Sequence, residues 1–181
     1  MLSLARILSG YSGSIKTHIV SFTKIQEAIH AHCPPEYTTL VMRRYMVRIA
    51  DLIAQREKAA ALITGESIGQ VASQTMEALA ATDILATRPV FRPLVGFDKL
   101  EIIRLAEKIG TYETSSLPYE DCCTVFTPRH PVTRPRLDRV LEAEQAIPDI
   151  DEMVQQAVDT AEVLYISPEE TIAQELSGEK A

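Results

Sequence analysis

The 181-residue sequence has no tryptophan, three cysteines and no uninterrupted apolar run long enough for a membrane helix. A spanning helix needs about 20 such residues, so one is excluded. An odd number of cysteines cannot all pair within one chain, and Cys122 and Cys123 are adjacent, which disfavours a disulfide framework. The amino-terminal MLSLARILSG carries Arg6 and no small-residue cleavage site, which argues against a signal peptide. We therefore expect a soluble, cytoplasmic protein with free or redox-active thiols.

Basic residues are also scarce. Eighteen Lys and Arg stand against 25 Asp and Glu, which gives a net charge of -7. This charge repels a phosphate backbone and does not supply the basic surface on which nucleic-acid binding normally depends. Tight RNA binding by this chain alone is therefore not expected. What the sequence does have is 46% hydrophobic residues, enough to form the core of one domain.

Apolar spacing and turn residues predict alternating strands and helices along the chain. Strands are predicted at 15–22, 59–64 and 90–91, the second of them buried on both faces. Helices are predicted at 2–8, 23–32, 36–57, 70–85, 98–110, 135–145 and 149–163. A long proline-rich loop, 111–136, interrupts this alternation. The fold class is therefore α/β: a partial doubly wound, Rossmann-like parallel sheet with helices on both faces.

The helix predicted at 36–57 has one apolar stripe. Its members recur at helical spacing and should be buried: Met42, Tyr45, Met46, Ile49 and Ile53. The same spacing turns the polar residues toward solvent: Arg44, Arg48, Asp51 and Gln55. Arg43 lies at the margin between the two faces.

The segment 64–75, TGESIGQVASQT, has the strongest pattern of residues that could bind a ligand. It joins a predicted strand to a predicted helix, and ligands of open α/β sheets bind at the carboxyl ends of strands. Gly65 permits close approach to the backbone, and Ser67, Gln70 and Gln74 offer neutral hydrogen-bonding groups, the two glutamines on one helix face. The helix amino terminus could also face a phosphate. An ordinary capped strand-to-helix turn explains the same residues, and both interpretations remain open at this point.

Three motifs in order resemble the tRNA 4-thiouridine synthetase (tRNA sulfurtransferase, thiamine biosynthesis sulfur-transfer) family: TGESIGQVASQT, RPLVGFDKLEIIRLAEKIGTYE and LPYEDCC. The resemblance extends from Met1 to about residue 143. It implies that 1–166 is the carboxyl-terminal part of a pyrophosphatase-loop ATP-binding and thiolation domain, of the adenine nucleotide alpha-hydrolase type. Residues 167–181 are expected to be a polar tail.

The resemblance also implies ATP and magnesium as cofactors. Carried over by position, the nucleotide contacts fall on Arg43, Gly65 and Gln74, and the pattern of side chains adds Ser67 and Gln70. A planar guanidinium suits phosphate oxygens, which favours Arg43 as a phosphate or nucleotide contact. A solvated helix face is the alternative for this arginine.

Sulfur chemistry is expected at the vicinal cysteines, because a thiolate can carry or attack a sulfane sulfur. Related enzymes have one cysteine in this loop, followed by a hydrophobic pair. That cysteine aligns best with Cys123, because Thr124-Val125-Phe126 follows it. We therefore predict Cys123 as the catalytic residue, with Cys122 as its resolving partner or substitute. The alternative is a metal site with Cys33 and the histidines of HAHC, but adjacent cysteines do not match zinc-ligand spacing, so no metal ligand is assigned.

The expected partners also follow from the resemblance. They are tRNA, held through segments missing from this chain, and a cysteine desulfurase as the persulfide donor. No membrane partner is expected, and a homodimer remains an open alternative. The family's serine- and glycine-rich pyrophosphate loop, its amino-terminal RNA-binding module and the rhodanese-like extension of some members do not occur in the sequence. We therefore expect a truncated form, whose catalytic competence by itself is an open question.

Overall fold

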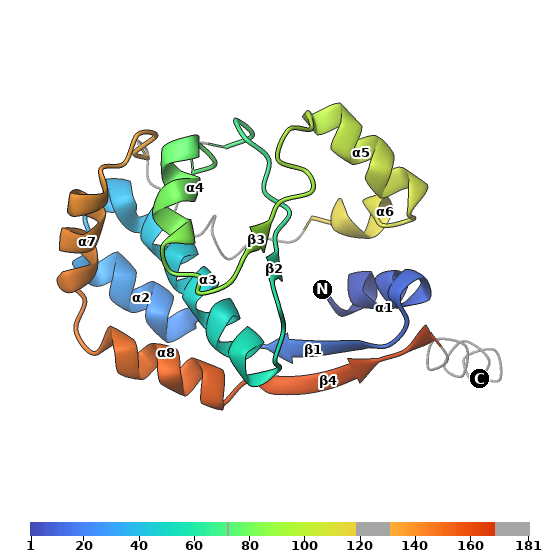
Figure 1. Ribbon diagram of the computed structural model, residues 1–181, viewed down its shortest axis with the longest axis horizontal. Coiled ribbons are helices and arrows are strands. Elements are labelled where there is room, and N and C mark those ends of the chain that lie inside the picture. The colour runs from blue at the N-terminus through green and yellow to red at the C-terminus, as the bar shows by residue number, and fades with distance from the viewer. Residues whose placement is uncertain (72, 119–130, 169–181) are drawn as a thin grey trace. The chain divides into compact units, whose positions relative to one another are not determined.

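In the computed structural model, which describes residues 1–71, 73–118 and 131–168, the chain divides into two units (Figure 1). The first comprises Met1–Val20, Leu100–Tyr119 and Ala161–Ala181, and the second comprises Ser21–Lys99 and Glu120–Thr160. Elements of the first are α1 (Leu2–Ser12), β1 (Ile15–Ile19), most of α5 (Lys99–Lys108), α6 (Tyr112–Ser115) and β4 (Glu162–Ile166). Elements of the second are α2 (Thr23–His32), the 3-10 helix η1 (Pro35–Tyr37), α3 (Thr38–Arg56), β2 (Leu62–Ile63), α4 (Met76–Asp83), β3 (Val90–Phe91), α7 (Leu137–Gln145) and α8 (Ile150–Asp159).

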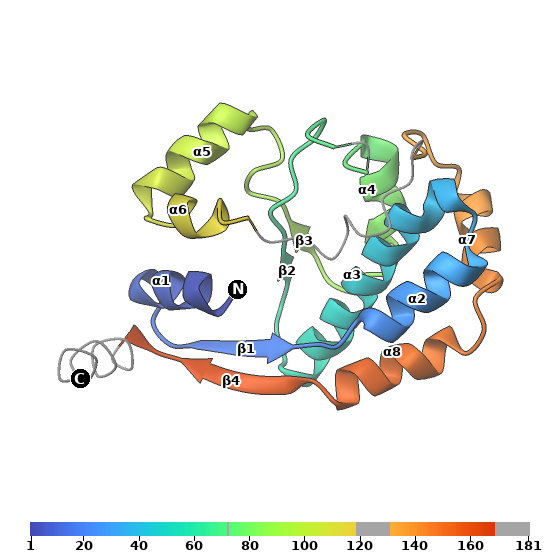
Figure 2. The ribbon, with the colours of Figure 1, turned by 180° about the vertical axis from the view of Figure 1, so that it is seen from behind.

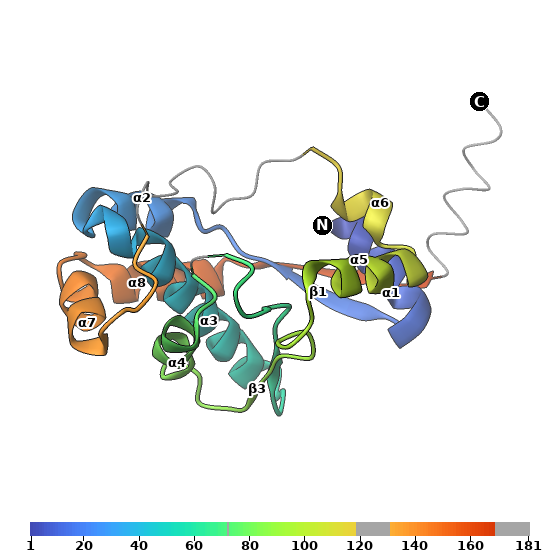
Figure 3. The ribbon, with the colours of Figure 1, turned by 90° about the horizontal axis from the view of Figure 1, so that it is seen from above.

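Helix α3 is the central element of the second unit. It contacts α2, α4, α7, α8 and β2, which Figure 2 shows around it, and Figure 3 shows the four helices from above. Its predicted bounds are correct to within two residues, and Met42, Tyr45 and Ile49 of the predicted stripe are buried. Because apolar side chains recur along 19 residues, the helix can bury one face against several neighbours at once.

Two residues predicted to face solvent on α3 are buried instead. Arg44 has no exposed surface and Asp51 is only 6% exposed. Each is paired: Arg44 with Glu144 of α7, and Asp51 with Arg88. A buried charge is tolerated when it is paired and hydrogen-bonded, and an amphipathic pattern contains no information about such partners.

The parallel part of the predicted sheet is the pair β2–β3, in which Leu62 aligns with Val90 and Ile63 with Phe91. It confirms the α/β class. Strand β2 is shorter than predicted, and burial on both faces is wrong: Ile63 is 73% exposed and Phe91 56% exposed. Side chains alternate between the faces of a strand, so Leu62 and Val90, on the other face, are the partly buried pair.

The first unit contains an antiparallel pair, β1–β4, in which Ile15 aligns with Ile166 and Ile19 with Glu162. The predicted fold requires β1 and β2 to lie in one parallel sheet. In the described residues they belong to two separate sheets, so this part of the prediction is wrong. The helix predicted to extend to residue 163 ends at Asp159, and EVLYI follows it as β4. Branched and aromatic residues favour a strand there, and β1 provides its hydrogen-bonding partner.

The helix predicted from residue 70 begins only at Met76. Gly69 has a positive φ of 78°, its amide donates to the Gln74 carbonyl (3.0 Å), and the Gln74 amide donates to the Val71 carbonyl (2.9 Å). Thr75 then caps α4, its side-chain oxygen accepting from the Ala78 amide at 3.2 Å. The turn uses the backbone groups that a longer helix would need. None of the described helices is long and apolar enough to cross a membrane.

Candidate functional site

Hydrogen bonds hold the loop after β2 to the end of β3 and to the segment that follows it. The amides of Thr64 and Ile68 donate to the carbonyls of Phe91 (3.0 Å) and Val95 (3.1 Å), and the Ser67 hydroxyl donates to the Phe97 carbonyl (2.7 Å). The loop therefore continues the parallel pairing of β2 and β3 beyond the strands. It places residues 64–67 at the carboxyl end of β2, where ligands of α/β sheets bind.

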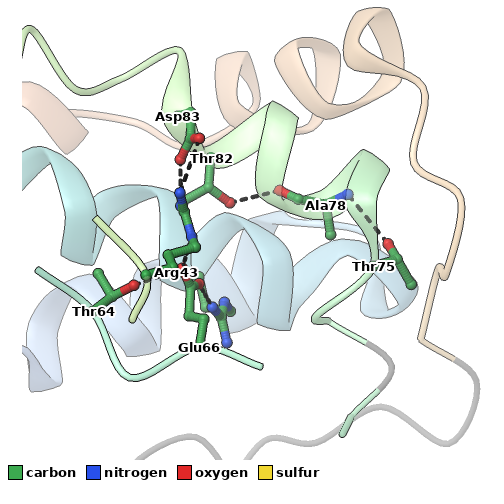
Figure 4. Close-up of polar contacts among 8 residues, drawn as sticks. Arg43, Thr64, Glu66, Thr75, Ala78, Thr82 and Asp83 are labelled. Atoms are coloured by element: carbon green, nitrogen blue, oxygen red, sulfur yellow. Dashed lines mark hydrogen bonds and ion pairs between the residues drawn. The ribbon is translucent and has the colours of Figure 1, made fainter. Parts of the chain in front are cut away.

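Four charged side chains meet at this loop, and we call them the Glu66 cluster: Arg43, Glu66, Asp83 and Arg92. Figure 4 labels the first three of them. Glu66 Oε1 pairs with Nη2 of Arg43, and Oε2 accepts from Nε of Arg92 and, at 2.9 Å, from the Thr64 hydroxyl. Arg92 also forms a bidentate ion pair with Asp83, in which its two Nη atoms donate to the two carboxylate oxygens. The side chains of Glu66, Arg92 and Arg43 are 8%, 10% and 18% exposed. The cluster is therefore a partly buried network of two positive and two negative charges.

A cavity of about 320 Å³ adjoins the cluster. Its apolar wall comes from α3 and β2, namely Met46, Val47, Ala50, Leu62 and Ile63. Its polar edge is formed by Arg43, Thr64 and Glu66. An apolar wall with a few convergent polar groups is typical of small-molecule sites.

The structure brings two of the predicted nucleotide contacts to this place. Arg43 lines the cavity, and Gly65 lies between Thr64 and Glu66 with open space where a side chain would stand. Ser67 is buried, and its hydroxyl is used by the Phe97 carbonyl. Gln70 and Gln74 lie in the turn before α4, so the prediction that they share a helix face is wrong.

Sequence reasoning did not single out Glu66 or Arg92. Glu66 stands inside the motif that attracted attention, and Arg92 is the arginine of RPL, directly after β3. An acidic residue three positions after one strand and a basic residue one position after the neighbouring strand could have been paired, because adjacent parallel strands end at the same edge.

Cys122 and Cys123, which the sequence predicts to be catalytic, lie outside the described residues. Cys33 is described: it is 6% exposed, it follows α2 as the C-cap residue, and its thiol donates to the Pro34 carbonyl at 3.5 Å. Burial, and then the negative charges of Glu144 and Glu36, raise the pKa of the Cys33 thiol to about 12. Cys33 is therefore a neutral packing residue at physiological pH. Among the described side chains, no three or more His, Cys, Asp or Glu are grouped to hold a metal ion.

Residues 1–148 match the family described as thiamine biosynthesis protein (ThiI). The chain belongs to this family. It is 55% identical over 167 residues to a "Probable tRNA sulfurtransferase" of Lachnoclostridium phytofermentans, covering 92% of this chain and 43% of that protein. It is 52% identical over 170 residues to a protein of the same name from Agathobacter rectalis, covering 93% and 43%.

A solved structure of a ThiI-type enzyme also resembles the chain. It is a 4-thiouridine synthetase in complex with RNA and with bound ATP, 42% identical, with a TM-score of 0.85 over 90% of this chain and 43% of that one. The chain thus spans about two fifths of the length of the ThiI relatives that it matches.

Proposed function

We propose that the chain is part of an ATP-dependent tRNA sulfurtransferase that converts a uridine of tRNA to 4-thiouridine, and that it forms part of the ATP pocket and carries the sulfur-transferring cysteine. Membership of the ThiI family supports this, together with the likeness to a 4-thiouridine synthetase that holds RNA and ATP. The observation that carries the proposal is the cavity at the carboxyl end of β2 with Arg43 at its edge. The whole domain would then be doubly wound and cytoplasmic.

The proposed chemistry has three steps. The carbonyl oxygen at C4 of uridine attacks the α-phosphorus of ATP, pyrophosphate leaves, and the oxygen becomes part of a good leaving group. The terminal sulfur of a Cys123 persulfide then attacks C4, and AMP leaves with the original oxygen. Finally the Cys122 thiolate attacks Sγ of Cys123, the bond between the two persulfide sulfurs breaks, and 4-thiouridine leaves as the Cys122–Cys123 disulfide forms. Catalysis by this route requires the attacking oxygen, the α-phosphorus and the leaving pyrophosphate to be held in line. Fixed cations and backbone N–H donors can hold them so.

Arg43, Gly65 and Gln74 are the proposed nucleotide contacts of this chain, and Ser67 and Gln70 are the candidates beside them. The position of Arg43 in the lining of the cavity supports its assignment as a nucleotide contact. The open space at Gly65 supports close approach of a ligand to the backbone. Magnesium would arrive with the ATP phosphates, and no described residue is assigned to it.

Cys123 is the proposed sulfur carrier, with Cys122 as the second thiol that forms a disulfide when the sulfur is released. The sulfur would come from a cysteine desulfurase, and the terminal persulfide sulfur on Cys123 would go either to the uridine or to thiazole synthesis for thiamine. Cys33 is a poor alternative carrier, because its buried thiol has a raised pKa. Partners of the whole protein would be tRNA and the desulfurase, with a homodimer as an open alternative.

A thiolation assay tests the cysteine assignment. The chain, or the longer protein that contains it, is incubated with tRNA, ATP and a persulfide donor, and nucleosides are analysed by mass spectrometry. Cys123→Ser should abolish 4-thiouridine, whereas Cys33→Ser, the matched control, should leave it. Equal 4-thiouridine from wild type and Cys123→Ser would refute the assignment, and a different thiolated or amidated product would place the chain with another pyrophosphatase-loop ligase.

A second candidate function is a non-catalytic half-domain that needs a partner to bind ATP. It is favoured by the apolar surface that the β2–β3 pair leaves uncovered, where Ile63 is 73% exposed and Phe91 56% exposed, since a partner segment would bury that surface. Calorimetric titration of the chain with ATP separates the two. Clear binding would exclude the half-domain, and no binding until a longer partner is supplied would support it.

A further inference from the structure

Three side chains of the Glu66 cluster have no assigned role in the proposed function: Glu66, Arg92 and Asp83. We propose that Glu66 positions the Arg43 guanidinium at the cavity, and that Arg92 is the counter-ion that lets Glu66 release Arg43 to an anionic group of the nucleotide. This inference rests on the proposed ATP site. Glu66 and Arg92 are positioning residues, since they act through Arg43.

The first step of the argument is burial. The side chain of Glu66 is 8% exposed, so its negative charge must be neutralised by neighbours and not by water. Both of its oxygens are used, Oε1 by Arg43 and Oε2 by Arg92 and Thr64. A carboxylate gripped on both oxygens has one orientation, and it holds the Arg43 head in one place.

The second step is access. Arg43 lines the cavity and, of the two arginines, is the more exposed: 18% against 10% for Arg92. Arg92 is directed instead to Glu66 and Asp83. Arg43 is therefore the guanidinium that a ligand in the cavity can reach, and Arg92 is the one that stays with the carboxylates.

The third step is charge balance. If Arg43 turns to a phosphate oxygen, Glu66 keeps Arg92 and the Thr64 hydroxyl, so no buried charge is left without a partner. If Arg92 were neutral, Glu66 would have Arg43 as its only cation in the cluster. Removal of one partner of a buried pair is strongly unfavourable, so Glu66 would then compete with the ligand for Arg43.

The test is calorimetric titration of the chain with ATP. Arg92→Gln should weaken binding about tenfold, a coupling usual for residues in contact, and adding Glu66→Gln to it should restore most of the loss because the competing carboxylate is gone. Arg92→Lys, which keeps the charge, should bind like wild type. Arg48→Gln, on the surface of the same helix, is the matched control. Additive losses in the double variant would overturn the inference.

Asp83→Asn gives a second test if Arg92→Gln folds poorly. Asp83 is 43% exposed, so its amide variant should fold. The change leaves Arg92 entirely to Glu66 and adds one net positive charge to the cluster. ATP binding should therefore be unchanged or tighter, and a clear loss would overturn the inference.

Failure of the proposed ATP site can be distinguished from failure of this inference. If the unaltered chain binds no ATP, the inference is tested by the coupling energy between Arg43 and Glu66 in the free chain. A double-mutant cycle of urea unfolding measures this energy. The inference expects this coupling to grow when Arg92 is replaced by Gln, because Glu66 then depends on Arg43 alone. A coupling that is absent or unchanged by Arg92→Gln would overturn it.

Discussion

Two consecutive arginines of α3 have very different surroundings. Arg44 has no exposed surface, and its guanidinium donates to Glu144 of α7 and to the Ala81 carbonyl of α4. Arg43 is 18% exposed, lines a cavity and pairs with Glu66. Neighbouring helix positions point in different directions, so one arginine joins α3 to two other helices and the other reaches the candidate site. The comparison separates a buried charge that joins helices from a less buried charge that lines the candidate site.

The largest expected effect is on the buried side of this comparison. Arg44→Met should lower the free energy of unfolding by about 3–5 kcal/mol, because Glu144 would lose its cation and the Ala81 carbonyl its donor. Arg48→Met, the matched control, removes an exposed pair with Asp151 and should change stability by about 1 kcal/mol or less. Urea unfolding followed by circular dichroism measures both. Similar small losses in the two variants would contradict a structural role for Arg44.

The stability of the fold should also depend on pH, through two ionisable side chains that Glu144 influences, Cys33 and Tyr45. Burial, and then Glu144, raise the pKa of Cys33 to about 12, and the same causes in the same order raise the pKa of Tyr45 to about 12. The ordinary values are 9.0 and 10.0, so above them the unfolded chain loses protons that the folded chain keeps. Stability contributed by the neutral groups is therefore complete below pH 9 and is lost as pH rises to 12.

Tyr45→Phe checks this pH dependence. It removes the ionisable hydroxyl and keeps the ring, so the fall in unfolding free energy between pH 10 and 12 should be shallower than in wild type. Urea unfolding at a series of pH values measures the slope, and Tyr11→Phe, at a residue that is 67% exposed, is the control. An unchanged slope would show that Tyr45 does not contribute.

The smallest expected effect concerns Ser67. Its hydroxyl donates to the Phe97 carbonyl at 2.7 Å, so Ser67→Ala should lower the free energy of unfolding by about 1 kcal/mol. Thr160→Ala, which removes an exposed hydrogen bond to the Gln156 carbonyl, should lower it by less than about 0.5 kcal/mol. If Ser67→Ala reduced ATP affinity about tenfold without loss of stability, Ser67 would contact the ligand, as predicted from the sequence. Its hydrogen bond to Phe97 would then not be its main role.

Long periodic segments were the easiest parts to predict. Helix α3 is correct to within two residues because its apolar spacing continues for several turns. Helix α4 was started six residues too early, because the hydrogen-bonded turn closed at Gly69 and Gln74 has no periodic signature. Strand β4 is not predicted: the predicted helix 149–163 includes its first two residues, and 164–166 are assigned to no element, because the partner strand β1 is distant in sequence.

The site could be predicted only in part for a related reason. Arg43 and Gly65 were found through the resemblance, and the structure puts both at the cavity edge or beside it. Glu66, which pairs with Arg43, and Arg92, which pairs with Glu66, are separated by 26 positions, and they meet because β2 and β3 are adjacent. Arg44 was misjudged because a helical pattern treats every arginine as a surface residue, although a buried carboxylate can bring one inside.

The division of labour between the two arginines can be tested on one variant, Arg43→Gln, by measuring both its affinity for ATP and its free energy of unfolding. We predict that affinity falls at least about tenfold, because a charged hydrogen bond to the nucleotide is lost. Stability should fall by only about 1 kcal/mol, because Glu66 keeps Arg92 and Thr64 as partners. Unchanged ATP affinity, or a stability loss as large as that of Arg44→Met, would contradict the account.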